Sequence, residues 1–149
     1  MNDTFDLGRF VLAQESVYSQ VCGELRRGNK RSHWIWFIFP QMKGLGHSSM
    51  ADKFGIVSEY EAEAYLAHPI LGPRLIECTE LVNAVDGRSA GQIFGYPDDM
   101  KFRSSMTLFA QATTTNRIFA EAIDRYFDGN FDDLTLNILR LLPPREGRE

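Results

Sequence analysis

Residues 28–50 read GNKRSHWIWFIFPQMKGLGHSSM and carry the densest pattern in the chain. The segment opens with the cations Lys30 and Arg31, continues through two Trp and two Phe, and breaks at Pro40. A glycine-rich turn and two serines follow. No other part of the sequence combines charge, aromatic mass and flexible backbone so closely. The segment is therefore the first candidate both for core packing and for a binding site.

The bulk composition predicts one folded domain over residues 1–149. Hydrophobic residues make up 44% of the chain and aromatic residues 12%, which is enough for a core and argues against intrinsic disorder. A chain of 149 residues is long enough to bury most of its surface without staples. The net charge of −4 gives no reason to expect a nucleic-acid or membrane partner.

Several sequence signals are absent, and their absence sets further expectations. The N-terminus, MNDTFDLGRF, has no apolar region of the kind that secretory signals carry, and the longest apolar run, residues 34–40, is too short to span a bilayer. We therefore expect a cytoplasmic protein. Without a CxxC or HExxH motif, we expect neither a metal nor a cofactor. Cys22 and Cys78 fall in apolar helical patterns and are expected to be buried, and a disulfide between them is left open.

The segments before and within residues 28–50 are predicted to be helical. Apolar residues recur at helical spacing over residues 6–27, which predicts one helix that ends at Gly28. Residues 33–39 are predicted to form a short helix capped by Ser32. A buried strand is the alternative, because aromatic and β-branched residues favour strands. We favour the helix, since no partner strand is evident elsewhere.

The rest of the chain continues the helical pattern. Ser48 or Ser49, Ser58 and Ser89 are each placed to cap a helix, and Glu61 completes a capping box with Ser58. The predicted helices cover residues 50–54, 58–68, 70–85, 90–95, 98–112, 116–127 and 132–142. The fold class is therefore all-α, an irregular multihelical array of long and short helices with no significant sheet. Residues 143–149 are predicted to be a disordered tail.

Four blocks carry a resemblance to a known family. They are KRSHWIWFIFPQMKGLG, YLAHPILGPRL, IFGYPDDMKFRSSMTLF and FDGNFDDLTLNIL, at residues 30–46, 65–75, 93–109 and 127–139. In order, and over nearly the whole chain, they resemble a small bacterial family of unknown function whose members are often labelled calpastatin or calpastatin-like. The resemblance implies a multihelical single domain with no established activity. Calpastatins themselves are disordered polar inhibitors. This chain, in contrast, is rich in aromatic residues, and its apolar residues recur at helical spacing.

The first group of candidate site residues is Lys30, Arg31, Ser32 and His33. They offer two cations, a hydroxyl and a group that titrates near neutrality. A helix beginning at Ser32 would also direct free backbone N–H groups at an anion. The same residues suit a plain helix end, with a cap and a histidine bonded to a nearby carbonyl. Both interpretations stay open.

The aromatic residues and the glycine-rich turn extend this candidate site. On a helix Trp36 lies on a different side from Trp34 and Phe37, so its face could stack a ring, although core packing is the commoner role. Gln41 and the GLGHSS turn could form a loop that binds a phosphate or a sugar. The spacing of the turn fits neither a P-loop nor a dinucleotide-binding motif.

A second block lies at the start of the helix predicted over residues 98–112. Asp98 and Lys101 are i,i+3 neighbours there, and pairing of exposed charges is one interpretation. In the sharper interpretation Arg103 clamps an anion through two hydrogen bonds, Ser104 assists it, and Asp98 acts as a base.

Two functions from different classes follow. The first is a domain that binds an anionic, nucleotide-like small molecule. In its most concrete form it hydrolyses that molecule, with His33 or Asp98 as the candidate base. The ligand-binding candidates are Lys30, Arg31, Ser32, His33, Trp36, Gln41, Lys101, Arg103 and Ser104. The alternative is a non-catalytic helical module that binds or inhibits a protein partner, which predicts an exposed apolar patch. Whether the chain is an enzyme is left open.

Overall fold

The computed structural model describes residues 3–141, and this part of the chain is all-α, as predicted. Within it there are ten helices and no strand, and the one isolated β-bridge joins Met42 to Ile56. The helices are α1 (Gly8–Glu15), α2 (Tyr18–Arg26), α3 (Ile35–Ile38), α4 (Ser49–Phe54), α5 (Glu59–Ala67), α6 (Leu71–Asn83), α7 (Ala90–Phe94), α8 (Asp98–Ala112), α9 (Ile118–Phe127) and α10 (Asp133–Leu141).

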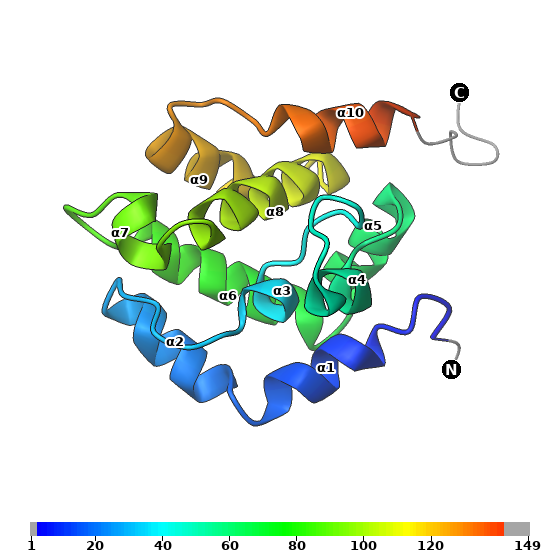
Figure 1. Cartoon of the computed structure of the whole chain (residues 1–149), viewed down its shortest axis with the longest axis horizontal. Coiled ribbons are helices and arrows are strands. Elements are labelled where there is room, and N and C mark those ends of the chain that lie inside the picture. The colour runs from blue at the N-terminus through cyan, green and yellow to red at the C-terminus, as the bar shows by residue number, and fades with distance from the viewer. Residues whose placement is uncertain (1–2, 142–149) are drawn as a thin grey trace.

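Helix α6 crosses the middle of the molecule, with α1 and α2 on one side and α8, α9 and α10 on the other (Figure 1). The short helices α3 and α4 lie between these groups. Phe39 follows α3 and is buried, and its ring centroid is 4.9 Å from that of Phe102 on α8. Phe102 also stacks on Phe94 of α7 at 4.6 Å. The aromatic part of residues 28–50 is therefore largely core.

The single helix predicted over residues 6–27 is wrong, because the chain bends at Ser16 and Val17 between α1 and α2. The two helices bury their faces against different partners. On α1, the buried amide of Gln14 donates to the backbone oxygen of Phe37 at 2.7 Å, while α2 packs on α6. A straight helix would reach only one of these partners, so tertiary packing overrides the continuous apolar spacing.

Helix α3 confirms the choice of helix over strand. It is a single turn of 4 residues and is shorter than the helix predicted over residues 33–39. Its N-cap residue is Trp34, and Ser32 does not cap it. The hydroxyl of Ser32 instead donates to the carboxylate of Glu24 at 2.7 Å. The amide of Ser32 also donates to Glu24, at 3.1 Å, so this carboxylate holds Ser32 in the turn that precedes the helix.

The other predicted serine caps are confirmed. Ser48, Ser58 and Ser89 each accept a hydrogen bond from a first-turn amide of α4, α5 and α7 respectively. At Ser89 the capping box is complete. At Ser58 it is not, because the Glu61 side chain accepts from the amide of Val57 at 2.9 Å instead.

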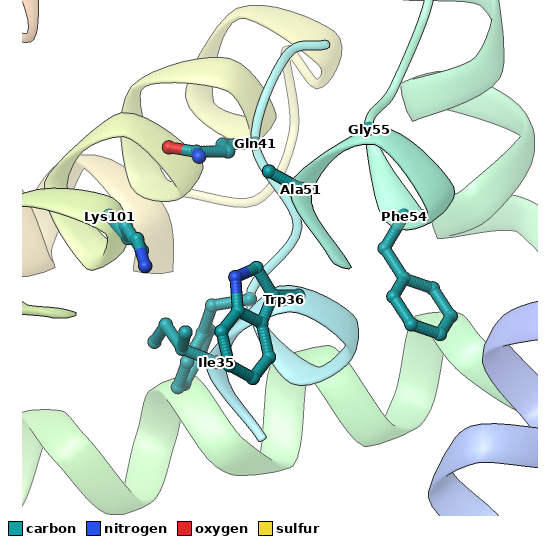
Figure 2. A pocket seen from close by; sticks show the side chains of 8 residues that line it. Ile35, Trp36, Gln41, Ala51, Phe54, Gly55 and Lys101 are labelled. Carbon is teal, nitrogen blue, oxygen red and sulfur yellow. The ribbon is translucent and has the colours of Figure 1, made fainter. Parts of the chain in front are cut away.

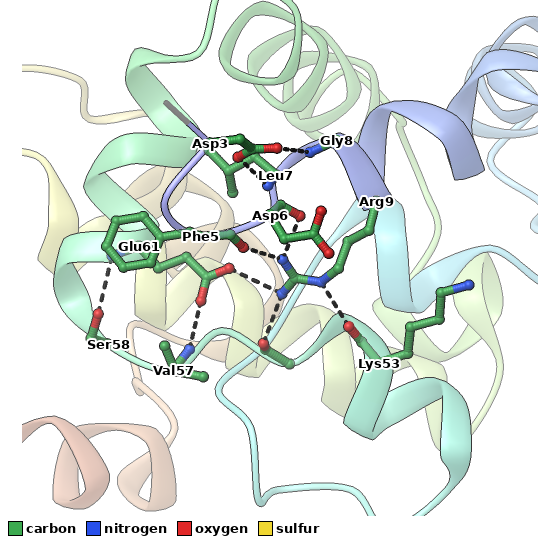
Figure 3. Close-up of polar contacts among 11 residues, drawn as sticks. Asp3, Phe5, Asp6, Leu7, Gly8, Arg9, Lys53, Val57, Ser58 and Glu61 are labelled. Atoms are coloured by element: carbon green, nitrogen blue, oxygen red, sulfur yellow. Dashed lines mark hydrogen bonds and ion pairs between the residues drawn. The ribbon is translucent and has the colours of Figure 1, made fainter. Parts of the chain in front are cut away.

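Glu61 has this other partner because it belongs to a network built on Arg9 of α1 (Figure 3). The Arg9 guanidinium donates to Glu61 at 3.0 Å and to backbone oxygens before α1 and around the end of α4. Those oxygens belong to Phe5, Asp6, Lys53 and Gly55. The network fastens the first helix to the α4–α5 connection, and we assign it a structural role.

The last helix, α10, is described as far as Leu141. The tail predicted at residues 143–149 lies outside the described residues. Among the helices of residues 3–141, none combines the length and apolar character needed to cross a bilayer.

Candidate functional site

Two adjoining depressions lie where α3 and the turn after it meet α8. The inner recess is lined by Ile35, Trp36, Phe39, Gln41, Ala51, Phe54, Gly55 and Lys101. The outer groove is lined by Gln41, Leu45, Gly46, Tyr96, Pro97, Met100, Lys101, Ser104, Asp132 and Leu134. Gln41 and Lys101 line both depressions, so we treat the two adjoining depressions as one candidate site.

The two parts differ in size. In the inner recess the centre of a water-sized group has about 10 Å³ to occupy, which suits one water or one small ligand group. The same measure gives about 330 Å³ for the outer groove. The groove therefore has room for most of a small molecule, and the recess for one of its substituents.

Trp36 supplies an unpartnered donor to the inner recess. Its indole Nε1 is buried and has no hydrogen-bond partner among the described residues. Figure 2 shows the Nε1 edge of the ring turned toward Lys101 and Gln41. The Lys101 ammonium lies 5.1 Å from the centroid of the indole ring. A buried N–H without an acceptor costs about 1–3 kcal/mol, so an acceptor placed in the recess would remove that cost.

Lysine and aspartate side chains join residues 28–50 to α8. Asp98, at the start of α8, forms ion pairs with Lys30 at 2.7 Å and with Lys101 at 3.6 Å. The Lys30 side chain is 6% exposed and also donates to the backbone oxygen of Ser32 at 2.6 Å. The Lys101 side chain is 24% exposed. Lys30 is thus buried and paired, whereas the partly exposed Lys101 can reach a ligand.

Backbone amides just before α3 bind a carboxylate of the protein itself. The amides of Arg31 and Ser32 donate to the Glu24 carboxylate at 2.9 and 3.1 Å, and the Trp34 indole donates to it at 2.9 Å. Burial raises the pKa of Glu24, but its hydrogen bonds outweigh burial and lower the pKa to about 2. The carboxylate of Glu24, a side chain of α2, therefore occupies these donors, and no helix begins at Ser32 to offer others to a ligand.

The other predicted residues lie apart from this site or are engaged elsewhere. Arg31 and His33 are exposed and line neither depression. The hydroxyl of Ser104 faces the outer groove but donates to Asp132 at 3.0 Å. Of the predicted residues, Trp36, Gln41, Lys101 and Ser104 line the site, and Lys30 and Asp98 adjoin it through the ion pair of Asp98 with Lys101. The predicted residues outside it are Arg31, Ser32, His33 and Arg103.

Arg103 points at the connection between α9 and α10. Its guanidinium donates to the backbone oxygens of Asn130 at 2.9 Å and Phe131 at 3.1 Å. It also lies over the ring of Phe127 at 5.6 Å. These contacts hold the chain that leads into α10.

Replacing Arg103 should therefore test stability. We expect Arg103→Ala to lower the free energy of unfolding by about 1–3 kcal/mol, because two backbone carbonyls lose a charged donor. Urea denaturation measures the change, with Arg31→Ala as a control that removes an exposed guanidinium. An Arg103→Ala protein as stable as the control would contradict the structural role.

The groove has an apolar rim, and none of its residues was predicted from the sequence to belong to a site. Tyr96 is 85% exposed and Leu134 63% exposed, and Met100 is exposed beside them. All three line the outer groove. The sequence offered one signal, a Tyr-Pro turn directly before the acidic start of α8. Leu134 could not be found in this way, because its helix is brought to the groove only by the fold.

Comparisons with known proteins agree with the fold. The family described as "Protein of unknown function (DUF1810)" matches residues 4–139. A crystal structure of a conserved hypothetical protein from Mycobacterium tuberculosis is similar, with 55% sequence identity and a TM-score of 0.93. The similarity covers 94% of this chain and 100% of that chain. No curated protein matches with significance. Neither match carries a calpastatin label.

Proposed function

The chain belongs to the DUF1810 family, whose function is unknown, and we propose that it binds a small anionic, nucleotide-like molecule at the joined recess and groove. The observation that carries the proposal is the buried, unpartnered Nε1 of Trp36 beside the Lys101 ammonium. An anionic oxygen in the recess would accept from both groups. Hydrogen bonds to charged groups are worth about 1.5–3 kcal/mol each.

The local charges favour an anion at the inner end of the site. Lys30 and Lys101 share the single carboxylate of Asp98, so one positive charge is left over. Asp132 carries a negative charge, but it lines only the outer groove. Its Oδ2 accepts from the hydroxyls of Ser104 and Thr135. The anionic group is therefore placed at Lys101 and Trp36, away from Asp132.

The rim of the groove favours a ring attached to that anion. Tyr96 offers an exposed aromatic face, and Met100 and Leu134 add apolar surface around the same opening. Aromatic and apolar side chains of this kind stack on flat rings. The favoured ligand therefore has its anionic group inward and its ring outward, as a nucleotide would.

The proposal is confined to binding. The carboxylate of Asp98 is occupied by two ammonium groups, and His33 lines neither depression. We assign no base and no bond to be cleaved. The alternative, a protein-interaction module, draws on the same apolar rim, but it leaves the buried indole donor and the lysine cluster without a role.

Melting temperatures measured with added ligands test the proposal. Nucleoside mono- and diphosphates, pyrophosphate and inorganic phosphate are the probes, and calorimetry gives the dissociation constant of any that stabilise the protein. We expect Lys101→Gln and Trp36→Phe each to weaken binding about 10- to 100-fold, because each removes one donor to the anion.

The matched control is Lys43→Gln. Lys43 is an exposed lysine in the turn after α3, and its side chain lines neither depression. It should bind like the unaltered protein. If no probe shifts the melting temperature, or if both site variants bind normally, the small-molecule proposal fails and the interaction module becomes the better hypothesis.

A further inference from the structure

The two cysteines of the chain lie together between α2 and α6, away from the recess and groove. Cys22 is on α2 and Cys78 on α6, and these helices pack against each other. Both thiols are free. Cys22 is 5% exposed and Cys78 is 1% exposed. Cys22 therefore keeps a small exposed edge, and Cys78 is more fully enclosed.

The surroundings of the thiols are polar, which is unusual for cysteines that only fill a core. The Sγ of Cys78 lies 3.9 Å from the hydroxyl of Tyr18, within hydrogen-bonding reach of sulfur. That hydroxyl donates to the carboxylate of Glu77. The guanidinium of Arg74 lies over the Tyr18 ring at 4.7 Å. The phenol beside Cys78 is thus itself held between a carboxylate and a cation.

The two thiols also affect each other's pKa, and they are not equivalent. Donation from Cys78 lowers the pKa of Cys22 to about 6; burial opposes this, and Tyr18 and Arg26 add to the lowering. The same contact, together with burial, raises the pKa of Cys78. Cys22 is therefore the thiol that ionises more readily, and Cys78 stays protonated to higher pH. A thiolate is the reactive form of cysteine.

We propose that Cys22 and Cys78 are a peroxide-reactive pair that closes into an intramolecular disulfide between α2 and α6. The Cys22 thiolate attacks one oxygen of hydrogen peroxide; with one proton this gives a sulfenic acid at Cys22 and releases water. The thiol of Cys78 then attacks the Cys22 sulfur, forms the S–S bond and releases a second water. Two thiols are oxidised, and one peroxide is reduced to two waters.

Position supports this division of roles. Cys22 has the surface edge that a molecule as small as hydrogen peroxide needs, while Cys78 is enclosed on the helix that packs against α2. A sulfenic acid formed at Cys22 would therefore meet a thiol before it met solvent. A thiol-based reductant would reopen the bond by disulfide exchange.

The full chain, reduced and then treated with hydrogen peroxide, tests the pair by intact mass and by thiol titration under denaturing conditions. We expect both thiols to disappear and the mass to fall by two hydrogen atoms, without covalent dimers. Because the chain has only two cysteines, the result cannot come from another pair. A reductant should restore both thiols, and the oxidised protein should melt at a higher temperature than the reduced one.

Two serine variants separate the roles. Cys78→Ser should gain one oxygen at Cys22, which a sulfenic-acid reagent such as dimedone traps. Cys22→Ser should keep its remaining thiol under the same treatment. The proposal is overturned if the unaltered protein keeps both thiols, gains oxygen without closing a bond, or dimerises through one cysteine. It is equally overturned if Cys22→Ser, shown folded by its melting curve, oxidises as fast as Cys78→Ser.

Discussion

Glu24→Gln is expected to lower the free energy of unfolding by about 3 kcal/mol, because it removes a buried charge around which an entire turn is built. Glu24 is 2% exposed. Its two oxygens accept hydrogen bonds from five donors. These are the backbone amides of Arg31 and Ser32, the hydroxyl of Ser32, the indole of Trp34 and the side-chain amide of Gln20. A glutamine would place an NH₂ group against some of these donors, and no rotation of the amide satisfies all of them.

Urea denaturation at neutral pH measures this loss. Glu80→Gln on α6 is the matched control, since it neutralises an exposed glutamate on a helix. We expect the control to change the free energy of unfolding by no more than about 0.5 kcal/mol. If the two variants were equally stable, the carboxylate would not be what holds residues 31–34 in place.

Acid should remove the same stabilisation in the unaltered protein. The pKa of Glu24 is lowered from 4.5 to about 2 in the folded state. A group whose folded pKa is depressed stabilises the fold above its unfolded pKa, and that contribution is lost as pH falls toward the folded value. The full contribution is about 3 kcal/mol, and about 2 kcal/mol of it should be lost by about pH 3.

The difference between the unaltered protein and Glu24→Gln isolates this group from the other carboxylates. That difference should be full at about pH 6 and reduced to about a third at about pH 3. Thermal or urea unfolding of both proteins at the two pH values gives the comparison. A gap that stays constant with pH would show that charge on Glu24 is not the source of its effect.

The role of Glu24 could not be predicted from the sequence. The serine caps of α4, α5 and α7 were predictable, because a cap is a contact between residues three positions apart. Glu24 sits among apolar residues on α2, and nothing nearby in the sequence reveals that five donors will surround it. The break between α1 and α2 is hidden in the same way, since it depends on which helices each half covers.

The candidate site was predictable in its chemistry but not in its geometry. Trp36 was singled out as lying on a different side from Trp34, and the structure places its Nε1 in a recess. The meeting of Lys30 with Asp98 could not be foreseen, because it depends on how α8 crosses the segment. Arg103 was predicted to bind an anion because its guanidinium suits that role. In the structure its guanidinium instead donates to backbone carbonyl oxygens.

The junction between α5 and α6 depends on a different kind of constraint, which the backbone imposes. Gly72 is the second residue of α6 and is buried. A Cβ at this position would lie 2.1 Å from the backbone oxygen of Leu66, near the end of α5. Carbon and oxygen atoms cannot approach so closely, and a backbone oxygen cannot swing away as a flexible side chain can. The two helix ends would have to separate.

We therefore expect Gly72→Ala to destabilise the protein by about 3 kcal/mol or more, although alanine is the better helix former. Gly23→Ala is the matched control. Gly23 is also inside a helix, but its Cβ would come no closer than 3.7 Å to the guanidinium of Arg27, which is an ordinary contact. The control should stabilise the protein by about 0.5–1 kcal/mol. Opposite signs in urea denaturation would confirm that close backbone approach requires glycine at position 72. A neutral Gly72→Ala would mean that α5 and α6 do not meet as closely as the structure indicates.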